Sequence, residues 1–252
     1  TVCIRVAGME CISCLDHIDL SKAKEYHFDY ERIWSEDGRI LTKITNDRLV
    51  VINKIKAHQS FSDVTYKFWQ RKEGAKVVEW QEIEPDDLTT GNWGTRDCVS
   101  GGAAFRGKRP IIDNGFDVFK GENVSACLIE GNPQEANIDI TNVDDSSLWK
   151  YLDVMPENAF AFLQISIGLN AVKFNMKQKA FLNTASLFVP DRQHQDFPFD
   201  VVVLSNVYQF YYALYLRMGI VEEFWSHLYP TNLKMLPWSE TLMDYQDELE
   251  AL

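Results

Sequence analysis

The sequence has few cysteines, no long hydrophobic run and no leader-like N-terminus. The five cysteines form an odd set without regular spacing: Cys3, Cys11, Cys14, Cys98 and Cys127. Such a set does not build a disulfide framework and indicates a reducing compartment. The longest apolar stretch, 201–216, is broken by polar residues, and a bilayer needs roughly 20 apolar residues. No charged head precedes an apolar signal core. We therefore expect a cytoplasmic protein with no membrane segment.

Catalytic motifs are also missing. None of the five histidines lies in an HExxH motif or a nucleophile elbow, and the glycines match neither a Walker loop nor GxGxxG. There is no Asn/Asp/Ser-Pro-Pro-aromatic tetrapeptide of the kind that grips an adenine amino group. Cys11 and Cys14 form a CxxC with His17 nearby, but a zinc site needs a second ligand pair. We expect no catalytic residue, no bound cofactor and no metal, and a coincidental CxxC in a hairpin loop is favoured over a metal or redox motif.

An excess of positive charge is missing too. The chain has 25 Lys and Arg against 37 Asp and Glu, a net charge of −12. A stand-alone nucleic-acid binder carries a basic face, because neutralised phosphates supply much of its affinity. The charges are nevertheless segregated along the chain: the charged residues of 173–192 are Lys173, Lys177, Lys179 and Arg192 against Asp191, and those of 244–252 are all acidic. The total charge weakens a nucleic-acid hypothesis without excluding it.

The composition, 46% hydrophobic and 25% charged, is that of a globular protein large enough for one large or two small domains. Period-two or apolar patterns predict strands at 1–7, 15–20, 77–83 and 180–189 and a hairpin over 111–119 with its turn at 113–115. Helices are expected at 156–162, at 200–219 with Asp200 as its cap, at 221–228 and from Ser239 onward. Strands in the first two thirds and helices in the last third predict an α+β fold.

Four segments carry a further signal. Residues 107–124 contain GKRP and then FDVFKGENV, residues 179–190 read KAFLNTASLFVP, residues 203–212 read VLSNVYQFYY, and residues 233–238 read LKMLPW. In order and spacing they resemble the C-terminal target-recognition (specificity) region of adenine-N6 DNA methyltransferases of restriction-modification systems. The third departs from the family pattern, with Ser205-Asn206 where Asn-Ser is usual.

The resemblance implies a division of the chain. Residues 1–90 would hold the last hairpin of a catalytic domain and a connecting region, and residues 91–252 the DNA target-recognition domain. Because the chain begins with Thr1 and ends inside a helical pattern, we expect a fragment whose catalytic half lies upstream. That upstream half would bind S-adenosylmethionine and flip the target adenine. The expected partners are double-stranded DNA and the upstream methyltransferase domain.

Recognition of DNA calls for glycine-bearing loops with cationic and amide side chains that reach phosphates and base edges. The candidates are Lys108, Arg109, Lys120, Asn123, Lys173, Lys177, Lys179, Asn183, Thr184, Asn232 and Lys234. Each candidate also has an interpretation that involves no DNA contact. Surface lysines are usually only solvated, and an asparagine such as Asn123 commonly closes a turn. The aromatic residues of 208–215 and the tryptophans Trp69, Trp80 and Trp93 are interpreted as packing residues.

A second hypothesis is a protein-interaction or scaffolding domain without a nucleic-acid role, which the acidic total and the acidic tail favour. A third, a hydrolase with scattered acidic catalysts, has no motif in its support. A basic cleft formed by residues 107–124 and 173–192 would favour DNA, and a uniformly negative surface would favour the scaffold.

Overall fold

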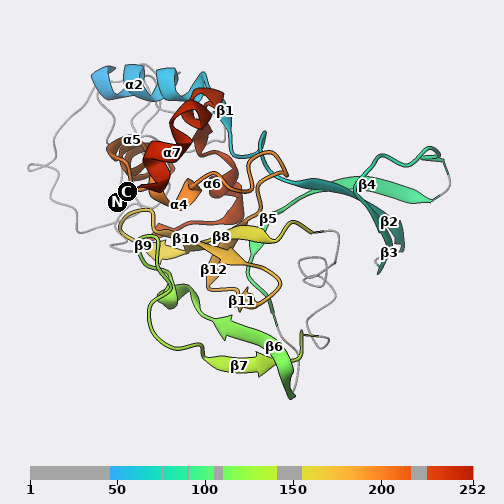
Figure 1. Cartoon of the computed structure of the whole chain (residues 1–252). Helices are drawn as coiled ribbons and strands as arrows, with labels where there is room; N and C mark the ends of the chain where they lie inside the picture. The colour runs from blue at the N-terminus through green and yellow to red at the C-terminus, as the bar shows by residue number, and fades with distance from the viewer. Residues whose placement is uncertain are drawn as a thin grey trace, which may run out of the picture.

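The computed structural model describes residues 46–74, 76–89, 91–104, 110–140, 155–216 and 226–251. They form an α+β fold, as the sequence predicts, with strands mostly in the first two thirds and helices gathered toward the C-terminus (Figure 1). The strands predicted at 1–7 and 15–20 lie outside the described residues, as do Cys11 and Cys14. No helix in the described part of the chain is long and apolar enough to cross a membrane.

The centre of the molecule is a four-stranded antiparallel sheet, ordered β10 (Ala171–Asn175), β8 (Asn158–Leu163), β12 (Ala185–Phe188) and β5 (Val99–Gly101). Helices cover one face, and a smaller sheet lies beyond the other (Figure 1). Each face therefore has a core of its own.

Strand β8 links the two cores. Phe160 and Phe162 belong to the cluster on the helical side, and Ala159 and Ala161 belong to the cluster on the opposite side. The helix predicted at 156–162 is therefore wrong. A short run that is apolar at every position has no usable period, so a strand buried on both faces resembles a buried helix in sequence.

The helical layer comprises short elements, and Phe199 lies at its centre. These are α2 (Asn46–Lys56), α4 (Phe199–Val202), α5 (Asn206–Tyr211), the π-helix η5 (Tyr212–Leu216), α6 (Pro230–Lys234), the 3-10 helix η6 (Glu240–Tyr245) and α7 (Gln246–Glu250). The last two confirm the helix predicted from Ser239. Strands β1 (Gln59–Ser60) and β14 (Pro237–Trp238) pair along this layer.

The single helix predicted over 200–219 is interrupted. It begins at Phe199 with Pro198 as its N-cap, so Asp200 lies inside the first turn and is not the cap. The chain leaves helical geometry at 203–205, where the Val203 carbonyl accepts a hydrogen bond from the Gln209 side chain (2.8 Å). Gly219, its predicted end, lies outside the described residues. Of the helix predicted at 221–228, residues 226–227 form strand β13 (Ser226–His227), which pairs with β9 (Ile165–Ser166).

The smaller sheet, ordered β11 (Lys179–Phe181), β6 (Ile111–Phe119) and β7 (Glu135–Ile138), corrects two predictions. Residues 111–119 are one strand and not a hairpin: Ile111 and Phe116 both lie opposite Ile138, so the turn-like residues between them form a bulge. Asn114 accordingly has a φ of 57°. The single strand predicted at 180–189 is divided by a turn at 183–184, so that β11 and β12 join different sheets.

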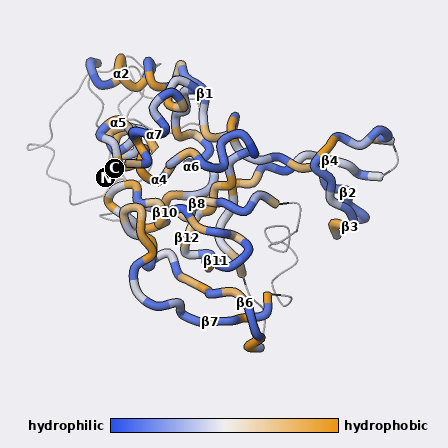
Figure 2. Tube along the Cα trace, in the orientation of Figure 1, coloured by the Kyte–Doolittle hydropathy of each residue, from blue (hydrophilic) through white to orange (hydrophobic). Residues whose placement is uncertain are grey.

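A three-stranded antiparallel sheet, ordered β3 (Lys76–Gln81), β2 (Lys67–Glu73) and β4 (Asn92–Asp97), projects from the body (Figure 1). We call it the arm. Strand β3 confirms the strand predicted at 77–83. Much of the arm is coloured hydrophilic, with hydrophobic positions between (Figure 2). The domain boundary predicted at residue 90 falls between β3 and β4, inside this sheet.

Polar contacts fasten the base of the arm to the body. Glu82 accepts hydrogen bonds from the Tyr66 hydroxyl and from Arg192, and the Arg192 guanidinium lies 5.7 Å from the centre of the Tyr66 ring. Burial and the neighbouring Glu82 carboxylate raise the pKa of Tyr66 well above its usual value, so the phenol stays a donor. Lys234 on α6 pairs with Asp97 at 2.6 Å.

Candidate functional site

Segments 107–124 and 179–190 meet where β6 and β11 run parallel. Lys179 is in register with Asp117, and Phe181 with Phe119. Parallel strands end at the same edge of a sheet, so the residues that follow Phe119 and Phe181 come together. The Gly121 N–H donates to Thr184 Oγ1 at 2.8 Å, and Leu182 N–H donates to the Phe119 carbonyl at 2.8 Å. Four predicted residues lie at this end of the two strands: Lys120, Asn123, Asn183 and Thr184. Two more, Lys177 and Lys179, lie at the start of β11, and we call the six together the β6–β11 edge.

Within this edge Asn123 holds a turn. Its Oδ1 accepts the Lys120 N–H at 2.9 Å, and its Nδ2 donates to the Glu130 carbonyl at 2.7 Å. The carboxamide is thus engaged at both ends, as expected of a residue that closes a turn. The Lys120 ammonium lies 3.3 Å from Glu122, and the two side chains are 40% and 73% exposed. Such exposed pairs are weak, so Lys120 is available to another anion.

The other members of the edge lie on the turns that flank β11. The Lys177 N–H donates to Asn175 Oδ1 at 2.7 Å, which fixes the turn before the strand. Lys179 forms no ion pair with any other described residue. Asn183 and Thr184 are exposed at the turn after the strand. The edge therefore presents Lys177 and Lys179 at one end, and Lys120 with amide and hydroxyl groups at the other.

Three predicted residues lie elsewhere and serve the fold. Lys173 on β10 lies 3.7 Å from Asp196. Asn232 is only 5% exposed, and its Oδ1 accepts the Tyr229 N–H at 3.3 Å. Lys234 forms its ion pair with Asp97 at the base of the arm. We leave Asn232 and Lys234 out of the contact surface, because burial and a close ion pair remove them from a ligand. Lys108 and Arg109 lie outside the described residues.

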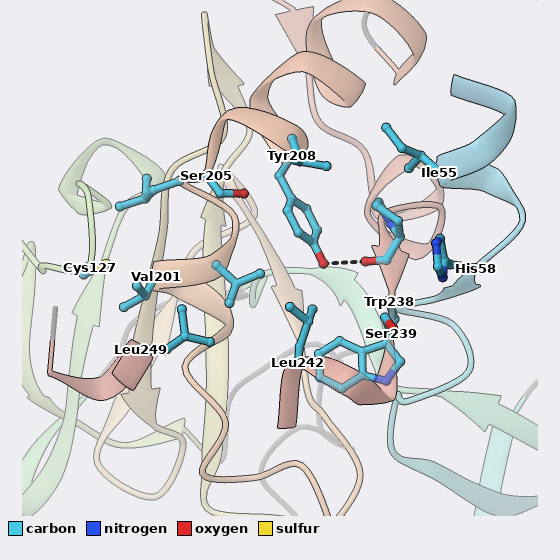
Figure 3. A pocket seen from close by; sticks show the side chains of 14 residues that line it. Ile55, His58, Cys127, Val201, Ser205, Tyr208, Trp238, Ser239, Leu242 and Leu249 are labelled. Carbon is cyan, nitrogen blue, oxygen red and sulfur yellow. Dashed lines mark hydrogen bonds between the residues drawn. The ribbon is translucent and has the colours of Figure 1, made fainter. Parts of the chain in front are cut away.

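An apolar cavity of about 640 Å³ opens among α2, α4, α5 and the C-terminal helices (Figure 3). Cys127 lies at one end and His58 at the other, with aliphatic side chains such as Leu249 and Leu242 between them (Figure 3). The Tyr208 hydroxyl donates to the Pro237 carbonyl at 2.6 Å, and burial raises the pKa of Tyr208 above its usual range.

The cavity has no activated nucleophile among the described residues that line it. Burial, and to a smaller degree the Asp200 carboxylate, raise the pKa of Cys127 to about 11, so its thiol is protonated at neutral pH. The phenol of Tyr208 is likewise held protonated. Apart from His58 at one end, the lining therefore offers mainly hydrophobic contact.

A buried histidine lies between two carboxylates beside the cavity. His194 is 6% exposed, with Nδ1 at 2.6 Å from Asp191 Oδ1 and Nε2 at 3.3 Å from Glu240 Oε2. Glu240 also accepts the Trp238 indole N–H at 3.0 Å. Trp238 meets the His194 ring edge to face at 5.3 Å. These contacts connect the loop after β12 to the start of η6.

This cluster predicts a pH-dependent contribution to stability. The Trp238 N–H, and then His194, hold the pKa of Glu240 below its ordinary value of 4.5. A group whose pKa is lowered by folding stabilises the native state above that value, and the contribution is lost as the pH falls through the folded pKa. Glu240→Gln is expected to lower the melting temperature at pH 7 by about 1–2 °C, because the carboxylate is partly exposed. The difference in melting temperature from the unsubstituted protein should shrink below pH 4.5.

Calorimetry across this pH range measures the difference in melting temperature, with the exposed Glu248→Gln as control. An equal difference at both extremes of pH would contradict the assignment.

One group of polar side chains, on the arm, is not among the residues predicted from the sequence. Gln70, Lys72 and Asn92 lie on neighbouring positions of β2 and β4. Their position could have been inferred from the strand pattern. Phe68, Gln70 and Lys72 alternate along β2 and so share one face, which begins with an aromatic residue and continues with polar ones. In the sequence, the nearby tryptophans Trp69, Trp80 and Trp93 indicate packing instead.

In the described part of the chain, no cluster of three or more His, Cys, Asp or Glu side chains is arranged to hold a metal ion. Comparison with known proteins found no protein family that matches the chain and no curated relative.

Proposed function

We propose that this chain recognises double-stranded DNA for an adenine-N6 methyltransferase, using the β6–β11 edge as one contact surface. The observation that carries the proposal is the hydrogen bond between Gly121 and Thr184, which are 63 positions apart in the sequence. It belongs to the junction of the two segments, 107–124 and 179–190, that resemble the recognition region of such enzymes. Scattered residues thereby become neighbours on one edge.

The chemistry of the edge suits this role. Lysines on turns reach phosphate oxygens, and exposed amide and hydroxyl groups form hydrogen bonds to base edges. Lys177 and Lys179 would contact phosphates, and Asn183 would lie nearer the bases. Methylation of adenine requires a flipped base, which the upstream catalytic domain with its S-adenosylmethionine would hold while this chain binds the duplex.

The net charge of −12 limits how the chain binds alone. Asp117 and Glu122 lie among the lysines of the edge, so the local surface is mixed in charge. Weak and strongly salt-dependent binding is therefore expected from the isolated chain, with tighter binding once the upstream domain adds its own phosphate contacts.

Charge reversal at the edge tests the proposal. Lys177→Glu and Lys179→Glu are each expected to weaken binding to every duplex sequence by about tenfold near 0.1 M salt, because each removes one phosphate contact. Each should also reduce the slope of log affinity against log salt by about 0.9. Fluorescence anisotropy with labelled duplexes measures both quantities. Lys54→Glu, on α2, makes the same change of charge away from the edge and is expected to have a much smaller effect.

Two results would count against the proposal. One is an absence of duplex binding at low salt that persists after the upstream half is restored. The other is an equal loss of affinity in the α2 control and in the edge variants, which would show that only total charge matters. A change of sequence preference in the lysine variants would mean that they contact bases and not phosphates.

A second candidate is a protein-interaction domain. It is favoured by the exposed acids of the C-terminal helices, Asp244, Asp247, Glu248 and Glu250, and by the apolar cavity beside them. This candidate requires a protein partner that stays bound at salt concentrations which strip DNA.

A further inference from the structure

The apolar cavity beside the C-terminal helices has the size and the lining of a ligand site. Its volume of about 640 Å³ lies within the range of about 300–1,000 Å³ that is usual for pockets which bury a small molecule. Among the described residues that line it there is no Lys, Arg, Asp or Glu. Because a charge that is buried without a partner is costly, the part of a ligand that fills the cavity must be uncharged.

The wall between the two ends of the cavity is mainly aliphatic. Leu242 lies between the ends, and Val201 and Leu249 lie toward Cys127 (Figure 3). The Tyr208 hydroxyl in this wall already donates to the Pro237 carbonyl at 2.6 Å, so it needs no acceptor from a ligand. A hydrocarbon chain suits such a wall, because it requires no polar partner along its length.

The end of the cavity at Cys127 has a negative environment. The buried Asp200 lies close enough to Cys127 that its carboxylate contributes, after burial, to the raised pKa of the thiol. Leu249, which lines the same end, is flanked in the chain by the exposed Glu248 and Glu250. An anionic group is disfavoured at this end, so it suits only the apolar tail of an anionic ligand.

The opposite end of the cavity is polar and has cations beside it. His58 is exposed there, and α2 ends next to it with Lys54 and Lys56 in its last turn. Lys54 is exposed and forms no ion pair with another described residue. The sequence from 48 to 62 contains no acid. This end therefore attracts an anionic group, and the exposure of His58 keeps that group in contact with water.

One acid near the His58 end, Glu240, is already engaged. It follows Ser239, which lines this end of the cavity. One carboxylate oxygen of Glu240 accepts the Trp238 indole N–H at 3.0 Å, and the other lies 3.3 Å from His194 Nε2. With both oxygens held by these neighbours, Glu240 competes little for a head group at His58.

We propose that the cavity binds a long-chain fatty acid, with its carboxylate at His58 and its hydrocarbon tail directed toward Cys127. The inference goes beyond the proposed DNA-binding function and does not depend on it. The aliphatic wall accommodates the chain, and the opposite charges beside the two ends fix its direction. Since the carboxylate stays at the exposed end, no charge is buried without a partner.

Displacement of the fluorescent fatty acid parinarate from the full chain measures binding. Three competitors, used below their micellar concentrations, share one tail and differ in head group: palmitate, hexadecanol and hexadecyltrimethylammonium. Palmitate is expected to bind about tenfold more tightly than the ammonium compound, with the alcohol between them. The net charge of −12 would by itself favour the cation, so this order reports the local charge at His58. Shorter fatty acids should lose about tenfold in affinity for each pair of methylene groups removed.

Substitutions at the two parts of the site separate head group from tail. His58→Glu should weaken palmitate about tenfold and leave hexadecanol unchanged, because the exposed imidazole faces only the head group. Asn92→Glu is the control, since it adds a negative charge on the arm, away from the cavity. Leu242→Trp fills the middle of the cavity and should weaken all three competitors alike.

The Cys127 thiol reports occupancy without any substitution, which keeps the test usable if Leu242→Trp does not fold. Bound palmitate should slow the reaction of Cys127 with methyl methanethiosulfonate, and peptide mass spectrometry identifies the modified cysteine. An unchanged rate at Cys127 overturns the placement of the tail.

The other outcomes are equally distinct. Equal affinity for palmitate and the ammonium compound, or equal losses in His58→Glu and Asn92→Glu, overturns the placement of the head group. Affinity that does not depend on chain length overturns the burial of the tail. If parinarate does not bind, the inference is lost and the cavity is left to an apolar segment of a protein partner. None of these results bears on duplex binding, which is measured separately.

Discussion

Replacement of Phe199 by alanine is expected to lower the free energy of unfolding by about 3–5 kcal/mol, among the largest losses for a single side chain. Phe199 is fully buried, and five aromatic rings surround it with centres at 4.9–5.3 Å: Phe61, Phe160, Phe188, Phe197 and Trp238. Truncation therefore leaves a cavity and also removes edge-to-face contacts. Since single domains are stable by only about 5–15 kcal/mol, this loss is a large share of the total.

Urea denaturation followed by circular dichroism measures the effect. Tyr245→Ala is a suitable control, because it removes an aromatic ring that is 60% exposed and is expected to change stability by less than about 0.5 kcal/mol. Phe199→Leu keeps much of the volume and should lose less than the alanine variant, which keeps the comparison usable if Phe199→Ala does not fold. Equal midpoints for Phe199→Ala and Tyr245→Ala would show that the aromatic cluster is not the centre of the core.

Gly121→Ala is expected to have the next largest effect, by separating the two segments of the β6–β11 edge. A Cβ on Gly121 would lie 2.1 Å from the Thr184 carbonyl oxygen. No real Cβ tolerates such a distance to backbone, so β6 and the turn after β11 must move apart. Overpacking of this kind costs about 1–3 kcal/mol and sometimes more. Because the same junction carries the proposed DNA contacts, binding of duplexes should fall along with stability.

The chain offers a matched control for this substitution. Gly101 lies at the end of β5, and a Cβ there would meet only the Gln164 side chain at 4.0 Å, an ordinary contact. Gly101→Ala should therefore leave the denaturation midpoint nearly unchanged. If the two alanine variants prove equally stable, the close approach at Gly121 is not what joins the segments.

The fold class could be read from the sequence, because it depends on local periodicity. Strand β3 has alternating side chains, and the helix after Ser239 has a start signal. Elements whose conformation depends on distant partners could not be predicted. Strand β8 is apolar throughout because both of its faces are buried, and the Asp113-Asn114-Gly115 turn signal marks a bulge because β7 pairs on either side of it.

The candidate site also divides into features that local sequence predicts and features that depend on distant residues. The lysines and amides of segments 107–124 and 179–190 could be named from their types, but nothing local distinguishes the exposed Asn183 from the buried Asn232. The capture of Lys234 by Asp97 joins residues 137 positions apart. The pairing of Gln70 with Trp80 and Gly94 is likewise set by strand register, which one sequence does not display.

The bond between Gly121 and Thr184 is one of several that close very large loops, since Thr65 also binds the Val189 carbonyl across 124 positions. Formation of such contacts must await the synthesis and collapse of most of the chain, and chain entropy opposes each closure. Domains rich in remote pairings fold in milliseconds to seconds and not in microseconds. When only the arm and the strands β6 and β7 have emerged from the ribosome, neither of these two hydrogen bonds can form. The exposed strand edges then stay unpaired until residues 179–190 emerge.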